Sequence, residues 1–111
     1  MLSYGNFAIH MFFTLAAFMF TAAFAITPEE GAGLMQKYGC AACHEIDRPL
    51  VGPSYKAVAA RYRIDTQAKE KLFLKIKNGG SGVWGQVPMP PNPNIPDQDI
   101  QKLVEWILGI Q

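Results

Sequence analysis

The C-terminal segment has the clearest alternation of apolar and polar residues in the chain. Its apolar residues recur at positions i, i+3, i+4, i+7 and i+8: Ile100, Leu103, Val104, Ile107 and Leu108. This spacing places them on one face of a helix and leaves the opposite face polar. Asp97 and Asp99 stand at its beginning, where negative side chains favour a helix N-terminus. We therefore expect an amphipathic helix from Asp97 to about Gly109.

A further helix is predicted at residues 27–38. Thr27 is a good N-cap, Pro28 fits the first helical position, and Glu30 can close a capping box with Thr27. Gly39 marks the end of this helix, because glycine readily takes the backbone conformation that terminates one.

Two shorter helices are predicted in the middle of the chain. Residues 54–62 follow a Gly-Pro pair, and residues 66–77 end before an Asn-Gly-Gly sequence. The next segment, residues 78–96, contains five prolines and has no periodic pattern. A loop of that length in a small domain is usually functional. Because no strand pattern persists, we predict an all-α fold of about four helices.

The N-terminal segment is strongly apolar, and residues 1–25 contain no Asp, Glu, Lys or Arg. Residues 11–20 form an apolar run, and Ala23-Phe24-Ala25 matches the small-x-small pattern of a signal peptidase site. We predict that residues 1–25 are an export signal cleaved after Ala25, which leaves residues 26–111 as one domain. The segment has no Lys or Arg before the run, and the apolar stretch from Phe7 to Ile26 is about as long as the roughly 20 residues that span a bilayer. An uncleaved membrane anchor is therefore the alternative.

The predicted mature chain has 86 residues and carries all ten Lys and Arg and all nine Asp and Glu, so its net charge is +1. This near balance excludes strong nonspecific binding to nucleic acid. A domain of this size buries a modest core and often depends on a disulfide, a metal or a cofactor. The two cysteines are the obvious residues to supply that help.

Both cysteines and one of the two histidines lie within five residues, Cys40-Ala41-Ala42-Cys43-His44. C-x-x-C-H is the attachment motif of a c-type haem. Two thiols three positions apart in a helical turn can reach both vinyl groups of a porphyrin, and His44 can then ligate the iron. A thioredoxin-like pair needs a βαβ context that is absent, and a zinc site needs two more ligands. We predict one covalent haem c on Cys40 and Cys43, with His44 as the proximal ligand.

The second axial position of an electron-transfer haem is usually filled by Met or His. The predicted mature chain has no other His, and its only methionines are Met35 and Met89. Met35 lies in the helix predicted at residues 27–38, where it suits the core. Met89 is flanked by prolines, which restrict the backbone around it. We predict Met89 as the second ligand, the alternative being a methionine that only packs the loop against the core.

Beyond these motifs, the chain resembles the short bacterial class I cytochromes c. The resemblance covers residues 27–111 and rests on five segments: KYGCAACH at 37–44, VGPSY at 51–55, IKNGGSGVWG at 76–85, VPMPPN at 87–92 and EWIL at 105–108. It implies the class I cytochrome c fold, in which the helices wrap around one covalently bound haem. It also implies a one-electron carrier that serves nitrite reductases and terminal oxidases.

The resemblance assigns roles to three further residues. It implies that the carbonyl of Pro53 accepts a hydrogen bond from His44, that the indole N–H of Trp84 reaches a haem propionate, and that the amide of Asn92 contacts the axial Met. Residues 93–96 depart from the family pattern, because they are one residue longer and richer in proline. The entry to the last helix is therefore the least defined part of the prediction.

Two filled axial positions leave no iron site for a substrate, so we expect a carrier that cycles between Fe(III) and Fe(II) and is not an enzyme. The expected partners are a quinol-oxidising complex as donor and a nitrite reductase or terminal oxidase as acceptor. We expect a monomer in the periplasm, with no membrane span once the signal is removed. The alternatives are a haem subunit of a larger oxidoreductase complex, a haem-based gas sensor and a thiol-redox protein without haem.

Overall fold

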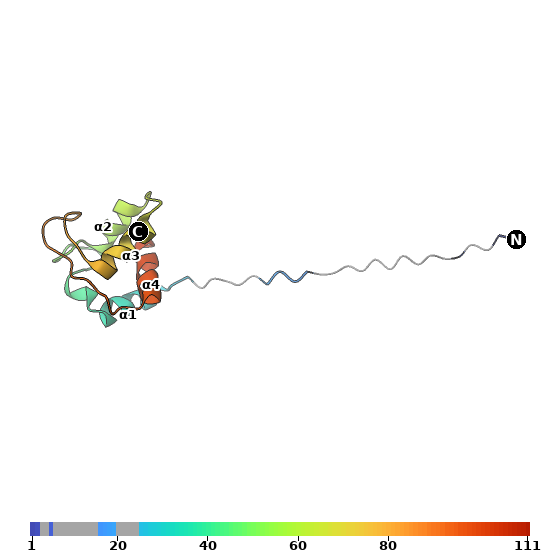
Figure 1. Ribbon diagram of the computed structural model, residues 1–111, viewed down its shortest axis with the longest axis horizontal. Helices are drawn as coiled ribbons and strands as arrows, with labels where there is room; N and C mark the ends of the chain where they lie inside the picture. Colours follow the sequence, from blue (N-terminus) through green and yellow to red (C-terminus); the bar gives the residue numbers. More distant parts are fainter. Residues whose placement is uncertain (3–4, 6–15, 20–24) are drawn as a thin grey trace.

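The computed structural model describes residues 1–2, 5, 16–19 and 25–111. Most of the predicted signal segment, with much of its apolar run, therefore lies outside the described residues. Within the described ranges, no helix is long and apolar enough to cross a membrane. These ranges contain four α-helices, one short 3₁₀ helix and no strand, only two isolated β-bridges, so the all-α prediction is confirmed (Figure 1).

The C-terminal helix α4 (Asp97–Leu108) is the base on which the other helices pack. Its predicted apolar face is confirmed, because Ile100, Leu103 and Val104 are 0 %, 1 % and 2 % exposed. Contacts join α4 to each of the other helices: α1 (Pro28–Lys37), α2 (Tyr55–Tyr62) and α3 (Ala68–Asn78). The core of the domain therefore lies along one face of its last helix.

Helix α1 begins and ends where the sequence predicts. The Thr27 hydroxyl accepts the backbone N–H of Glu30 at 3.1 Å, and the Thr27 N–H donates to the Glu30 carboxylate at 2.8 Å, which completes the capping box. After α1, Gly39 takes a positive φ of 73° and turns the chain into the 3₁₀ helix η1 (Cys40–Ala42). The buried Gly31 lies directly against the Trp106 indole of α4.

The two middle helices are also present, with one shifted boundary. Ser54 caps α2, since its hydroxyl accepts the Ala57 N–H at 3.1 Å. Helix α3 starts two residues later than the predicted Thr66, because Asp65 forms a turn there: its carboxylate accepts the Gln67 N–H at 2.9 Å. The long irregular segment follows α3 as predicted and continues to α4.

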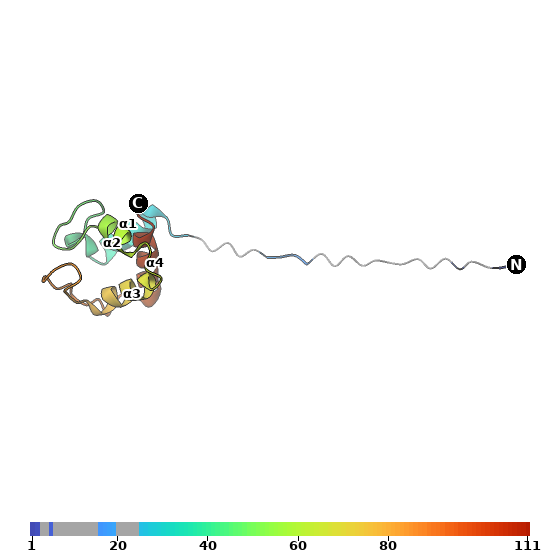
Figure 2. The same ribbon diagram turned by 90° about the horizontal axis from the view of Figure 1, so that it is seen from above.

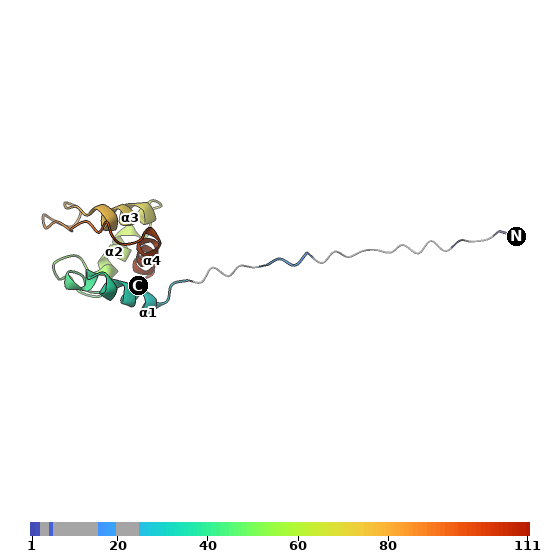
Figure 3. The same ribbon diagram turned by 60° about the horizontal axis from the view of Figure 1, so that its bottom comes forward.

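The helices form two walls on the α4 base. One wall consists of residues 28–62, which include α1, η1 and α2. The other consists of α3 and the irregular segment at residues 79–96. Figures 2 and 3 show α3 and its loop on one side, α1 with the loop that follows η1 on the other side, and α4 behind them. Residues of both walls and of α4 line a cleft between them.

Candidate functional site

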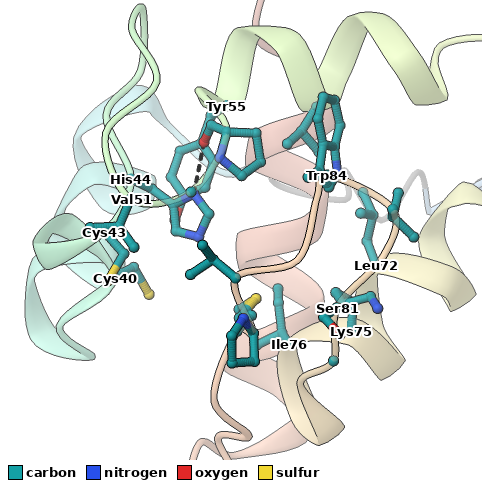
Figure 4. A pocket seen from close by; sticks show the side chains of 18 of the residues that line it. Cys40, Cys43, His44, Val51, Tyr55, Leu72, Lys75, Ile76, Ser81 and Trp84 are labelled. Atoms are coloured by element: carbon teal, nitrogen blue, oxygen red, sulfur yellow. Dashed lines mark hydrogen bonds between the residues drawn. The ribbon is translucent and has the colours of Figure 1, made fainter.

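Apolar residues make up most of the lining of the cleft. The first wall presents Cys40, Cys43 and His44, while Leu72, Lys75 and Ile76 of α3 face them from the opposite side (Figure 4). The floor is formed by Leu103 and Ile107 of α4. This combination of a large apolar space and a few polar groups is typical of a cofactor site.

Cys40 and Cys43 both line the cleft and do not form a disulfide with each other. η1 places them on one turn, and Gly39, in its left-handed conformation, directs the chain from α1 into that turn. Burial raises the pKa of the Cys40 thiol above its ordinary value. Two half-buried thiols that face an apolar cleft suit covalent attachment of a planar group between the walls.

His44 is held in one orientation by its neighbours. Its Nδ1 lies 2.8 Å from the carbonyl oxygen of Pro53, which can only accept, so Nδ1 carries the proton and Nε2 has a free lone pair (Figure 4). The ring of Tyr55 stacks on the imidazole with a centroid separation of 5.1 Å. A Cβ at Gly52 would lie 2.4 Å from His44 Cε1, so only glycine leaves room for the ring here. The free Nε2 is the atom that can ligate a metal.

Met89 lies on the opposite wall, in the proline-rich part of the loop, and lines the same cleft. Its backbone forms two hydrogen bonds with Gly80, at 2.8 and 2.9 Å, which close the loop between them. A Cβ at Gly79 would lie 2.3 Å from the Met89 carbonyl oxygen, so the loop packs closely on the end of α3. The backbone of Met89 is therefore fixed by pairing as well as by its flanking prolines.

Asn92 ties this loop to the C-terminal end of α3. Its side-chain amide donates to the carbonyl oxygens of Ile76 at 3.0 Å and Pro90 at 3.2 Å, and its backbone N–H donates to Lys77 at 3.0 Å. The predicted contact between this amide and the Met89 sulfur is not among these bonds and stays a prediction. Asn92 thus binds two carbonyls at the end of α3, the Ile76 carbonyl through its side-chain amide and the Lys77 carbonyl through its backbone N–H.

Trp84 lies on the same loop at the edge of the cleft, next to α2 (Figure 4). The indole is 43 % exposed. The Arg61 guanidinium of α2 lies 4.8 Å from the centroid of the ring. The structure thus brings Trp84 to the same cleft as the two cysteines, His44 and Met89.

Three residues of the site were not assigned a role from the sequence. Gly52 and Tyr55 shape the surroundings of His44, and the only sequence signal for them is their place within the VGPSY segment. Arg61 contacts Trp84 across 23 positions of the chain, and no local pattern indicates such a pair.

The residues of the cleft fit a covalently attached haem. The two thiols, a histidine with a free Nε2 and a methionine line one apolar cavity, and they are the donor set of a c-type haem with His and Met ligands.

The family model for cytochrome c matches residues 28–111, and the chain belongs to the cytochrome c family. It is 54 % identical over 77 residues to cytochrome c-551 of Allochromatium vinosum, a match that covers 69 % of this chain and 82 % of that protein. The crystal structure of cytochrome c552 from Nitrosomonas europaea superposes with a TM-score of 0.70 at 48 % identity and covers 72 % of this chain and 99 % of that one. Cytochrome c-551 of Azotobacter vinelandii is 49 % identical over 80 residues, which cover 72 % of this chain and 96 % of the relative.

Membership in this family establishes the cofactor and the activity. The protein carries a single covalently attached haem c and is a one-electron carrier, with redox partners rather than a substrate that it converts. The predicted family, fold and cofactor are thereby confirmed.

Proposed function

We propose that Cys40 and Cys43 hold the haem through thioether bonds and that His44 Nε2 and the Met89 sulfur are its two axial ligands. The observation that carries this assignment is the bond from His44 Nδ1 to the Pro53 carbonyl, because it fixes the tautomer and leaves Nε2 free within the cleft. Met89 lines the same cleft from the other wall, on a backbone paired with Gly80. When bound, the haem iron alternates between Fe(III) and Fe(II) and so supplies one-electron transfer.

The remaining site residues position these ligands and shape the surroundings of the haem. The Pro53 carbonyl orients His44 and makes its imidazole a better donor. Trp84 offers its indole N–H to a haem propionate at the edge of the cleft. Asn92 holds the loop that carries Met89 against the end of α3. Its amide is also proposed to contact the Met89 sulfur.

The walls of the cleft keep water and other ligands away from the iron. Leu72, Ile76, Leu103 and Ile107 give it an apolar lining, and Met and His fill both axial positions. A thioether ligand and an apolar setting both favour the reduced state, so they raise the reduction potential relative to two histidines in water. The same arrangement leaves no position for a gas or a substrate, in line with a carrier and not a sensor.

The partners are proposed from the resemblance of the chain to the short bacterial class I cytochromes c. Electrons come from a quinol-oxidising complex and pass to a nitrite reductase or a terminal oxidase. The exposed Val51 and Val87, at 57 % and 64 %, lie at the mouth of the cleft, where a partner can approach the haem. These acceptors are distinguished by mixing the reduced protein with a nitrite reductase or with a terminal oxidase and following oxidation of the haem by absorbance.

We also propose that residues 1–25 direct export to the periplasm and are removed after Ala25. N-terminal sequencing of the haem-containing protein from the periplasm should then begin at Ile26. Recovery only in detergent, with the first 25 residues still attached, would instead show a membrane-anchored carrier.

The ligand assignment is tested at Met89. The oxidised protein should show the weak far-red band of sulfur–iron charge transfer, and Met89→Ala should abolish that band and lower the reduction potential. Met35→Leu is the control, because Met35 is buried in α1 and the change conserves volume. It should keep the band and cost less than about 1.5 kcal/mol of stability. Loss of the band in Met35→Leu alone would reject the assignment.

A further inference from the structure

One side-chain hydrogen bond joins the two walls of the cleft directly. Among the hydrogen bonds and ion pairs of residues 25–111, the single one between residues 28–62 and residues 79–96 runs from Arg61 to Val83. Arg61 Nη1 donates to the Val83 carbonyl oxygen at 3.1 Å. Helices of both walls also pack on their shared base, α4. Arg61 therefore links the first wall to Val83, which lines the cleft from the other wall.

The same guanidinium also contacts the residue next to Val83. Its central carbon lies 4.8 Å from the centroid of the Trp84 ring, within the distance of a cation–π contact. A planar guanidinium can stack on a ring and donate to a carbonyl at once, which a lysine ammonium does less well. Arg61 thus fixes both the backbone before Trp84 and the face of its indole.

The turn that carries Trp84 is otherwise held by its own backbone. The Gly82 N–H donates to the Gly85 carbonyl at 2.8 Å, and both glycines have positive φ, 99° and 111°. A Cβ at either position would meet nothing within 4 Å, so the turn is not packed at these glycines. Glycines leave a chain conformationally free, so an external contact is needed to give the indole one position.

We propose that Arg61 is a positioning residue, which holds the Trp84 indole across the mouth of the cleft and thereby tunes the reduction potential of the haem. This inference rests on the proposed function, in which Trp84 faces a haem propionate. When the indole is held in place, it shields the haem edge from water on that side. When it is released, water reaches the haem edge and stabilises the more highly charged Fe(III) state, so the potential falls.

The test compares Arg61→Met with Arg63→Met in the holoprotein. Arg63 is the C-terminal cap of α2, is exposed, and forms no side-chain hydrogen bond or ion pair within residues 25–111. Each change removes one positive charge and keeps an unbranched side chain. Arg61→Met should lower the midpoint potential more than Arg63→Met does. It should also speed hydrogen exchange of the Gly82 amide by about three- to tenfold, as expected for losing a cation–π contact and one exposed hydrogen bond.

A comparison in the Trp84→Leu variant separates the effect of positioning the indole from the effect of removing a charge. In Trp84→Leu, which has no indole to hold, Arg61→Met should lower the potential no more than Arg63→Met does. An equal effect of Arg61→Met with and without the indole would overturn the proposal, as would unchanged Gly82 exchange. The far-red band of the unaltered protein is read in the same samples. If the band is absent, the proposed axial ligation by His44 and Met89 is wrong. If the band is present but hydrogen exchange of the Gly82 amide is unchanged, only the proposed role of Arg61 is wrong.

Discussion

At the scale of single residues, the space beside the His44 ring depends on the absence of a side chain at position 52. A Cβ there would lie 2.4, 2.8 and 3.0 Å from three atoms of the imidazole, closer than real side chains approach. The ring is also fixed by the Pro53 carbonyl and stacked on Tyr55, so it cannot move aside without losing one of these contacts.

Gly52→Ala should therefore displace His44 and destabilise the holoprotein, by about 1–3 kcal/mol as is typical of overpacking. Urea unfolding followed by the haem absorbance measures the loss, and NMR of the Nδ1 proton reports the bond to Pro53. An unchanged unfolding midpoint together with an unchanged Nδ1 signal would show that the ring tolerates the methyl group.

Asp65 gives the fold a defined dependence on acid. Its carboxylate accepts from Lys71 Nζ at 2.7 Å and from the Gln67 N–H, and these bonds hold the pKa of Asp65 below its ordinary value. A carboxyl with a lowered folded pKa stabilises the fold above its unfolded pKa, about 3.9. That contribution is lost as the pH falls through the lower, folded value.

Asp65→Asn should accordingly be less stable than the unaltered protein at neutral pH, and the difference should shrink in strong acid. Urea unfolding at a series of pH values measures it. Lys71→Met removes the partner and should weaken the same part of the pH dependence. A difference that stays constant from neutral pH into acid would contradict the role of Asp65.

At the scale of elements, α1 packs on α4 through a glycine and an indole. Gly31 is buried, and a Cβ there would lie 2.1 Å from Cγ of Trp106. The indole in turn contacts Tyr55 edge to face, with centroids 5.6 Å apart, so a shift of the indole would disturb this contact as well. These two helices can therefore approach closely only because residue 31 has no side chain.

Two alanines on the same helix test this packing. Gly31→Ala should destabilise the protein by about 1–3 kcal/mol, because the two helices must separate or Trp106 must move. Gly33→Ala is the matched control, since a Cβ at the exposed Gly33 would meet nothing within 4 Å. It should stabilise the helix by about 0.5–1 kcal/mol. Thermal unfolding of both variants gives the comparison, and similar effects from the two would contradict the contact.

The sequence predicted the helices well because their signals are local. Caps at Thr27 and Ser54 and the apolar face of α4 lie within a few residues of the elements that they define, and the structure contains all of them. The start of α3 was misplaced because the Asp65 turn competes with helix formation there. The placement of Met89 opposite His44 and the contact of Arg61 with Trp84 depend on how distant segments pack, which no local pattern records.

At the scale of the whole molecule, the cleft replaces what would be the centre of a core. Residues from both walls and from the base line it, among them Val58, Leu72 and Ile107. A domain of this size buries only a modest core along α4, so the haem is needed to complete the interior. Its binding free energy is then also folding free energy.

The double variant Cys40→Ala, Cys43→Ala should consequently yield a largely unfolded chain without haem. Far-UV circular dichroism and the lack of a cooperative thermal transition would show this. The unaltered protein should keep its haem through acid–acetone extraction, with a denatured mass one haem above that of residues 26–111. A folded variant without haem would mean that the helices suffice by themselves.

The position of α4 in the chain also sets when the protein can fold. Helices α1, α2 and α3 all pack on α4, which follows all three of them in the chain. A nascent chain therefore has no base on which to assemble until α4 has left the ribosome, and at typical elongation rates of about 5–20 residues per second the earlier helices stay unpacked for several seconds. Such a delay keeps the chain unfolded, and an unfolded chain is what a translocation channel requires of the exported protein proposed above.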